Sequence, residues 1–235
     1  MVSLAQSEMR APYVAIVDYE LGNLFSVKRA CELAGLTAVV TSSKSALSGA
    51  AGAVLPGVGA FGDAMETLTR LDLVSPLRDF IASGKPFFGI CLGVQLLMSE
   101  SHEFGRHRGL GVVPGMVVRL QSGPSGNRLK VPHIGWERIY GATGSNAWEG
   151  SLLGGLADGV YMYFVHSYVV QPEDESLVCS TSMYGDGEFC SSVNRGNLFG
   201  SQFHPERSGP EGLRMYANFA AKIKASLAEQ ESGIR

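Results

Sequence analysis

The fold is decided by the stretch Lys85-Pro-Phe-Phe-Gly-Ile-Cys91-Leu-Gly-Val-Gln-Leu-Leu-Met98. Residues 87–90 form an apolar run of aromatic and β-branched side chains after a proline, which predicts a short buried strand. From residue 92 onward the apolar residues recur with helical spacing, so the strand is expected to pass directly into a helix. Cys91 lies at this junction.

Cys91 has a glycine two residues away on each side, Gly89 and Gly93. This is the G-x-nucleophile-x-G pattern of a nucleophile elbow, with cysteine in place of serine. Glycines are required because a tight strand-to-helix turn strains the backbone and leaves no room for neighbouring Cβ atoms. The helix N-terminus favours thiolate over thiol, and the N–H of Leu92 can stabilise an oxyanion. The alternative is a buried core cysteine, which is what most free cysteines are.

Composition sets the class of protein. The 235 residues suffice for one large α/β domain, and 45% hydrophobic with 17% charged residues is ordinary for a soluble enzyme. A net charge of -3 predicts neither nucleic-acid nor membrane binding. The four cysteines have no C-x-x-C spacing, which argues against zinc and disulfides. With no signal peptide and no membrane-spanning run, we expect a cytoplasmic protein.

The first half of the chain alternates strands and helices. We expect a disordered extension at 1–11, followed by a single domain at 12–228. The predicted strands are 13–17, 37–40 and one beginning at 53. The predicted helices are 24–34 capped by Asn23, one capped by Asp63 that runs to about residue 71, and 75–83. This order predicts a mostly parallel, doubly wound central sheet with helices on both faces.

The second half changes rhythm. Strands are predicted at 111–120, 131–140, 161–170, 177–184, 189–194 and 198–203, with a polar loop at 121–127 and a final amphipathic helix at 212–227. Because helices are missing between these strands, we expect a mostly antiparallel extension of the sheet.

A glycine-rich loop, Pro56-Gly-Val-Gly-Ala-Phe-Gly62, follows the third strand. No Lys-Ser/Thr pair follows it, which excludes a Walker phosphate loop, and its glycine spacing is a poor dinucleotide fingerprint. The loop is better suited to present backbone N–H groups to a small anion or an oxyanion.

A histidine stands at the end of the last predicted strand, in Ser201-Gln-Phe-His204-Pro-Glu206. Pro205 biases His204 toward extended geometry, so Glu206 projects to the same side and can reach the imidazole. A carboxylate on one ring nitrogen leaves the other free to deprotonate a thiol. Alone, a His-x-Glu pair is more often a solvated surface pair.

Together the two halves resemble the class I, triad-type glutamine amidotransferases, whose fold is flavodoxin-like. The likeness extends to Leu55-Pro-Gly-Val-Gly-Ala-Phe61, Pro132-His-Ile-Gly-Trp136, Tyr163-Phe-Val-His-Ser-Tyr168 and Val17-Asp-Tyr-Glu-Leu-Gly-Asn23. Within this family the sequence is similar to the glutaminase subunits of imidazole glycerol phosphate synthase, from residue 14 to the last helix. The sequence departs from these subunits at two positions: it has Glu20 where they tend to have glycine, and Val94 where methionine is common.

The resemblance implies a role for each matching residue. Cys91 is the nucleophile, His204 the general base and acid, and Glu206 the residue that orients the imidazole. The remaining implied site residues are Leu92 and Val58 as oxyanion donors, and Gly57, Gly59, Gln95, His166, Ser167 and Tyr168 around the glutamine substrate. For the His166 side chain, packing in an aromatic cluster remains an equal alternative, and a structural or partner-facing role is expected for residues 132–136.

The implied activity is hydrolysis of glutamine to glutamate and ammonia through a cysteine thioester, with no metal or organic cofactor. The implied partner is a (β/α)8-barrel cyclase subunit, bound as a heterodimer, that uses the ammonia in histidine biosynthesis. Two rival enzymes are a glutaminase serving pyridoxal phosphate, anthranilate or purine synthesis, and a cysteine peptidase on the same scaffold. A non-catalytic binding subunit is a third alternative, which the intact Cys, His and Glu oppose.

Overall fold

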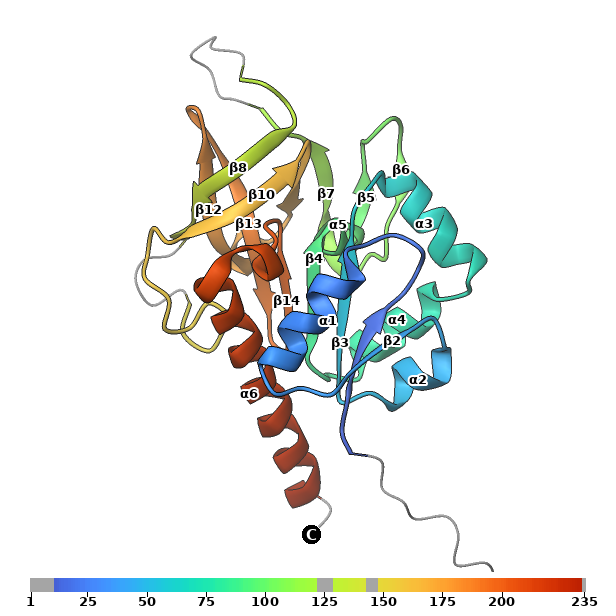
Figure 1. Ribbon diagram of the computed structural model, residues 1–235. Coiled ribbons are helices and arrows are strands. Elements are labelled where there is room, and N and C mark those ends of the chain that lie inside the picture. Colours follow the sequence, from blue (N-terminus) through green and yellow to red (C-terminus); the bar gives the residue numbers. More distant parts are fainter. Residues whose placement is uncertain (1–10, 122–128, 143–147, 234–235) are drawn as a thin grey trace, which may run out of the picture.

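A computed structural model describes residues 11–121, 129–142 and 148–233 (Figure 1). Its centre is a 12-stranded sheet whose main path runs β2-β1-β3-β4-β14-β13-β11-β7-β5-β6, with β12 and β9 attached beyond β13. The strands of this sheet are β1 (Val14–Val17), β2 (Ala38–Thr41), β3 (Gly52–Gly57), β4 (Phe87–Cys91), β5 (Met98–Ser101), β6 (His107–Arg108), β7 (Val113–Arg119), β9 (Tyr140–Gly141), β11 (Tyr168–Pro172), β12 (Val178–Tyr184), β13 (Gly187–Arg195) and β14 (Leu198–Ser201).

The predicted parallel half of the sheet is confirmed. β2, β1, β3, β4 and β14 are joined by parallel pairings throughout. β1 and β4 are buried along their whole length because helices cover both faces, as expected for strands in a doubly wound sheet. Since parallel strands end at the same edge, the carboxyl ends of β1, β3, β4 and β14 share one edge of the sheet, and the site forms there.

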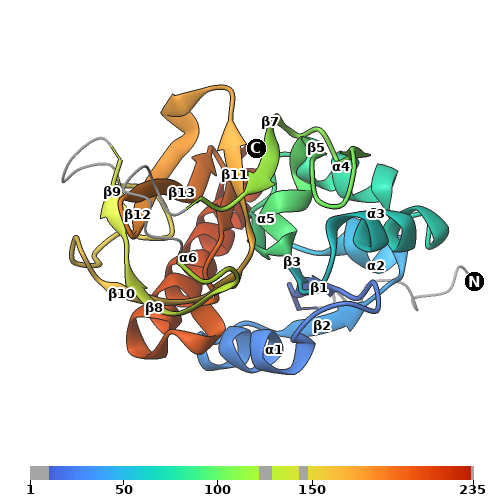
Figure 2. The same ribbon diagram turned by 90° about the horizontal axis from the view of Figure 1, so that it is seen from above.

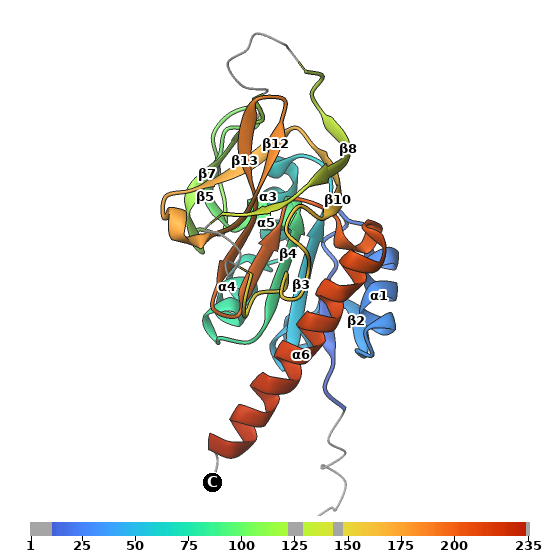
Figure 3. The same ribbon diagram turned by 90° about the vertical axis from the view of Figure 1, so that its left-hand side faces the viewer.

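Helices pack on both faces of the sheet. The helical segments are α1 (Leu24–Leu33), α2 (Lys44–Gly49), α3 (Phe61–Arg70), α4 (Val74–Ala82), α5 (Leu92–Leu96), η1 (Glu175–Leu177), η2 (Pro205–Arg207) and α6 (Gly209–Gly233). Successive residues of β1 point into opposite cores: Ala15 packs with α2, α3 and α4, and Ile16 packs with α1 and α6. Figure 3 shows β3 and β4 between α4 on one side and α1 and α6 on the other.

The antiparallel half carries a second layer. β8 (His133–Arg138) and β10 (Tyr161–His166) form a separate two-stranded sheet. Its Met162 and Phe164 pack into the same core as α6, and the pair lies across the antiparallel strands in Figures 1 and 2. The strand predicted at 161–170 is therefore wrong as one element, because the chain changes sheets at Ser167, between β10 and β11.

Other element predictions need correction. The helix after Cys91 ends at Leu96, and Met98 begins a strand instead of continuing the helix. α3 begins at Phe61, so Asp63 lies in its first turn and is not its cap. Asn23 does cap α1, with its side chain accepting from the Ser26 N–H. The short elements α2, β5 and β6 were not predicted, because segments this short carry little periodicity.

Two predictions fall almost wholly outside the described residues: the disordered extension at 1–11 and the loop at 121–127. Within the described ranges, no helix combines the length and apolar character needed to cross a bilayer.

Candidate active site

Cys91 occupies a strained turn at the end of β4. Its backbone has φ 53° and ψ -109°, in a region that favours glycine, and α5 begins at the next residue. A Cβ on Gly93 would lie 1.8 Å from the Leu55 carbonyl oxygen, so only glycine allows α5 to approach β3 this closely. The close approach of the Leu55 backbone thus explains why the elbow pattern requires glycine at position 93. Leu92, as the first helical residue, has an N–H without an intrahelical acceptor.

His204 and Glu206 form the second half of the site. β14 pairs with β4 in parallel, with Ser201 opposite Ile90, and this register carries His204 to the edge where Cys91 lies. His204 is extended, as Pro205 predicted, and its Nδ1 is 2.8 Å from Glu206 Oε1. Because the carboxylate accepts, Nδ1 carries the proton. Nε2 is buried without a hydrogen bond to any described residue and is available to the thiol.

The electrostatics favour the doubly protonated His204 ring, the form it takes once it has accepted the thiol proton. Burial by itself disfavours the charged His204 ring, but its interactions with Cys91 and then Glu206 outweigh burial and raise the pKa of His204 to about 10. A ring that holds its proton this firmly can donate it to a leaving group at neutral pH.

The other cysteines lack such an environment. Burial raises the pKa of Cys31 and of Cys190 to about 12, and burial also raises the pKa of Cys179. A protonated thiol is a poor nucleophile, so these three remain unreactive at neutral pH.

A cavity of about 250 Å³ opens beside the Cys91 thiol. Its described lining consists of Val58, Gly59, Cys91, Leu92, Gln95, Glu103, Pro132, Val165, His166, Ser167 and Tyr168. Most residues predicted for the site therefore meet here. Gly57 is not part of the lining: a Cβ there would lie 2.1 Å from the Tyr19 hydroxyl, so this glycine makes room for packing beneath the loop.

Gln95 is held by two hydrogen bonds of its own amide. Its Nε2 donates to the Tyr168 carbonyl oxygen and to Gln202 Oε1, both at 3.0 Å. These bonds use both amide hydrogens, so Oε1 is the group that Gln95 has left for a ligand.

His166 meets both descriptions weighed for it. Its ring lines the cavity and also packs against Phe164 and Phe189. Its Nδ1 lies 3.1 Å from the Tyr168 carbonyl oxygen and its Nε2 lies 3.3 Å from His133 Nδ1. The carbonyl can only accept, so His166 donates from Nδ1 and accepts at Nε2 from His133. Burial and then the neighbouring His133 lower the pKa of His166 to about 3, which keeps the ring neutral.

Two polar residues at the cavity, Glu103 and Gln202, were not predicted from the sequence. Glu103 is the one acidic side chain among the described lining residues, and its Oε2 accepts from the Phe61 N–H at 2.7 Å, at the start of α3. It lies in a charged loop that gave no signal beyond solvation. Gln202 is fully buried, and its Nε2 lies 3.7 Å from Cys91 Sγ. Its position two residues before His204 could have suggested it.

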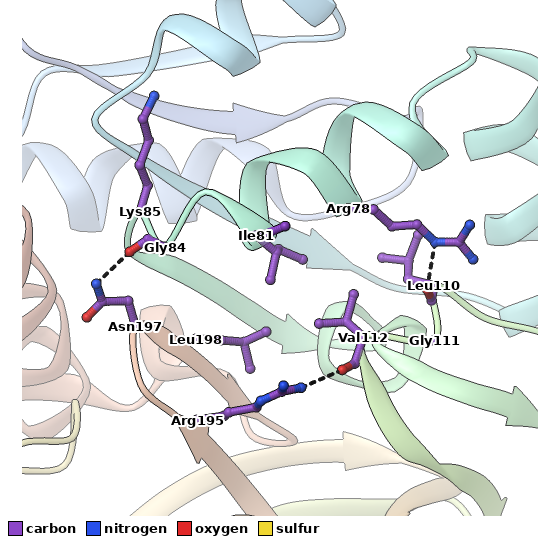
Figure 4. A pocket seen from close by; sticks show the side chains of 11 residues that line it. Arg78, Ile81, Gly84, Lys85, Leu110, Gly111, Val112, Arg195, Asn197 and Leu198 are labelled. Carbon is purple, nitrogen blue, oxygen red and sulfur yellow. Dashed lines mark hydrogen bonds between the residues drawn. The ribbon is translucent and has the colours of Figure 1, made fainter.

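A larger cavity, about 580 Å³, lies between α4 and the segments that precede β4, β7 and β14 (Figure 4). Its two arginines are held by backbone carbonyls, Arg78 by Leu110 at 2.7 Å and Arg195 by Val112 at 2.9 Å. None of the predicted site residues lines it. Over the described part of the chain, no group of three or more His, Cys, Asp or Glu side chains could hold a metal ion.

Comparison with known proteins shows which family the chain belongs to. Residues 15–223 match the family glutamine amidotransferase class-I. Imidazole glycerol phosphate synthase subunit HisH of Rhodopirellula baltica is 48% identical over 207 residues, covering 88% of this chain and 96% of that protein. The subunit of the same name from Aquifex aeolicus is 47% identical over 210 residues, covering 89% and 96%. The chain belongs to the HisH family of class I glutamine amidotransferases.

Solved structures agree with this fold. A crystal structure of a glutamine amidotransferase gives a TM-score of 0.67 at 21% identity, covering 90% of this chain and 98% of that one. PurLQS from Thermotoga maritima gives 0.67 at 19%, covering 93% and 100%. At these identities the likeness shows the fold alone.

The structure accommodates both departures of this HisH-family chain. Glu20 adopts φ 70°, the left-handed conformation that glycine takes most easily. The Asp18 carboxylate accepts a hydrogen bond from the Glu20 backbone N–H at 3.0 Å, and Arg70 donates to the Glu20 carboxylate at 2.6 Å. Val94 is buried against Gly200 of β14, where a Cβ would lie 2.3 Å from a valine methyl.

Proposed function

We propose that this chain is the glutaminase subunit of an imidazole glycerol phosphate synthase, with Cys91, His204 and Glu206 as its catalytic triad. The observation that carries the proposal is the hydrogen-bonded, buried His204–Glu206 pair beside a strained cysteine that opens into a small cavity. The names of the HisH relatives supply the pathway.

The chemistry proceeds through a thioester. His204 Nε2 takes the thiol proton, and Cys91 Sγ attacks the side-chain amide carbon of glutamine, placing negative charge on its oxygen. The N–H groups of Leu92 and Val58 stabilise that oxyanion. His204 then gives the proton to the amide nitrogen, the C–N bond breaks and ammonia leaves. Water, deprotonated by His204, attacks the thioester, and the C–S bond breaks to release glutamate.

The cavity supports glutamine as the substrate. At about 250 Å³ it is smaller than sites that hold drug-sized ligands, which favours a single amino acid over a peptide chain. The Glu103 carboxylate complements an α-ammonium group, and Gln95 Oε1 is available to accept from an amide N–H. Gly59, His166, Ser167 and Tyr168 complete the wall around it.

The partner is a cyclase subunit that consumes the ammonia. Ammonia is largely protonated in neutral water, and ammonium is not a nucleophile, so the catalytic edge is expected to dock on the cyclase. The loop at 18–23 follows β1 at the same edge as Cys91. Exposed apolar side chains support a contact surface there: Phe25 at the start of α1 is 82% exposed, and Phe104, whose ring lies 6.4 Å from that of Tyr168, is 85% exposed.

The decisive experiment measures ammonia release from glutamine with and without the cyclase, using wild type and Cys91→Ser. We expect the serine variant to fold but to lose glutamine turnover, because a hydroxyl is a far weaker nucleophile than a thiolate. Coupled turnover driven by added ammonium salt should persist. Glutamine turnover that survives the substitution would refute the assignment.

Docking is tested separately at Asp18. Asp18→Lys reverses a charge on the catalytic edge, whereas Asp18→Asn retains the acceptor for the Glu20 N–H. We expect the lysine variant to bind the cyclase more weakly than the asparagine variant while Cys91 stays reactive toward an affinity label. Equal cyclase binding by both variants would exclude this loop from the interface.

A further inference from the structure

The side chain of Gln202 lies in direct contact with the nucleophile. Gln202 immediately follows β14 and is fully buried, and its backbone N–H donates to the Ser191 carbonyl oxygen at 2.9 Å. Its amide Nε2 lies 3.7 Å from Cys91 Sγ, within hydrogen-bond distance of sulfur. Whether the NH₂ or the oxygen of this amide faces the sulfur decides whether Gln202 can donate a hydrogen bond to it.

The orientation of the Gln202 amide follows from a chain of hydrogen bonds. The Tyr168 carbonyl oxygen can only accept, so the group of Gln95 facing it at 3.0 Å is the NH₂. The second hydrogen of that NH₂ points to Gln202 at 3.0 Å, so the atom of Gln202 facing it is Oε1. Gln202 therefore presents its NH₂ to the sulfur. The Tyr168 carbonyl oxygen thus fixes the orientation of the Gln95 amide, which in turn fixes that of the Gln202 amide.

The sulfur also faces an acceptor. Cys91 Sγ lies 3.8 Å from the Val165 carbonyl oxygen, to which a thiol can donate its hydrogen. A thiolate has no hydrogen, so on deprotonation the Val165 contact becomes repulsive. The Gln202 contact changes in the opposite sense, because a hydrogen bond to an ionised acceptor is about twice as strong as one to a neutral acceptor. Of these two contacts, the one with Gln202 favours the charged form.

We propose that Gln202 is a further catalytic residue, which donates a hydrogen bond to the Cys91 thiolate, and that Gln95 positions it. The donor acts twice. It stabilises the thiolate that attacks, and it stabilises the sulfur again when the C–S bond of the thioester breaks and the electron pair returns to sulfur. The second role rests on the proposed glutaminase function, whereas the first concerns the resting enzyme alone.

The test is the pH dependence of Cys91 alkylation by iodoacetamide in the full-length chain, located by peptide mapping. Gln202→Met keeps nearly the same volume and removes the donor. We expect the midpoint of its alkylation profile to move upward by about one pH unit, because a hydrogen bond to a charged group is worth about this much. Glutamine turnover should fall roughly tenfold. Gln171→Met, at an exposed position on β11, is the matched control and should retain the wild-type midpoint.

Gln202→Glu is the second variant. It keeps an oxygen for Gln95 but turns a second oxygen toward sulfur, so we expect a larger upward shift of the midpoint. A folded Gln202→Met variant with the wild-type midpoint would overturn the proposal. If the methionine variant does not fold, an unshifted midpoint for Gln202→Glu does the same. Because alkylation requires no glutamine, the midpoint reports on Gln202 even if the proposed substrate is wrong.

Discussion

Glycine and alanine substitutions at Cys91 measure the strain in the elbow. Both remove the thiol, so they differ only in the Cβ and in backbone freedom. At an ordinary buried helical position such as Cys31 in α1, glycine should be less stable than alanine by about 2 kcal/mol, about 1 from helix propensity and 0.8 from the buried methyl group. At Cys91, with φ 53° and ψ -109°, glycine also relieves strain of about 1–3 kcal/mol.

The glycine-minus-alanine gap in unfolding free energy should therefore differ by about 2 kcal/mol between Cys91 and Cys31. For a chain of this size that difference corresponds to about 4–8 °C in melting temperature. Urea denaturation and thermal melts of the four variants supply the measurement, and wild type fixes the baseline. If the gap is the same at both positions, Cys91 is not strained and the reasoning from its backbone geometry fails.

Three further predictions concern the cavity, the elbow and pH. Glu103→Gln keeps an acceptor for the Phe61 N–H but removes a charge, so we expect KM for glutamine to rise about tenfold with little change in kcat; an equal loss in kcat would contradict a binding role. Gly93→Ala should lower the free energy of unfolding by about 3 kcal/mol or more in urea denaturation, because the Leu55 backbone blocks the new Cβ; an unchanged urea midpoint would contradict this. The pKa of His204 is raised from 6.5 to about 10, so its stabilising contribution is complete below pH 6.5 and is lost as pH rises through 10. The difference in unfolding free energy between wild type and His204→Asn should thus narrow from pH 6 to pH 10. A difference that widens over this range would contradict the raised pKa of His204.

The sequence predicted those parts of the site that depend on local spacing. The elbow around Cys91 and the His204–Glu206 contact each lie within a few residues, where turn geometry and the period of an extended strand suffice. The parallel half of the sheet was predictable because buried strands and helices alternate there.

The contacts that complete the site span the chain. Gln95 and Gln202 are 107 residues apart, and Glu103 reaches Phe61 across 42. No periodicity in a single sequence encodes such pairs, since each depends on which strands become neighbours. The change of sheet at Ser167 was hidden for a related reason: an unbroken apolar run looks the same whether its two halves join one sheet or two.

The ladder between β4 and β14 gives the catalytic pair a discrete geometry. Ser201 of β14 lies opposite Ile90 of β4. Ile90 is one residue before the nucleophile, and Ser201 is three residues before the catalytic histidine. Strands can exchange partners only by whole residues, and a slip that keeps the same side chains on the same face moves one strand by about 6.6 Å. The register of this ladder can therefore change only in steps of that size. A substitution that shifts the register would separate the sulfur and the imidazole by a whole step and break their contact, so its effect on activity should be all-or-none.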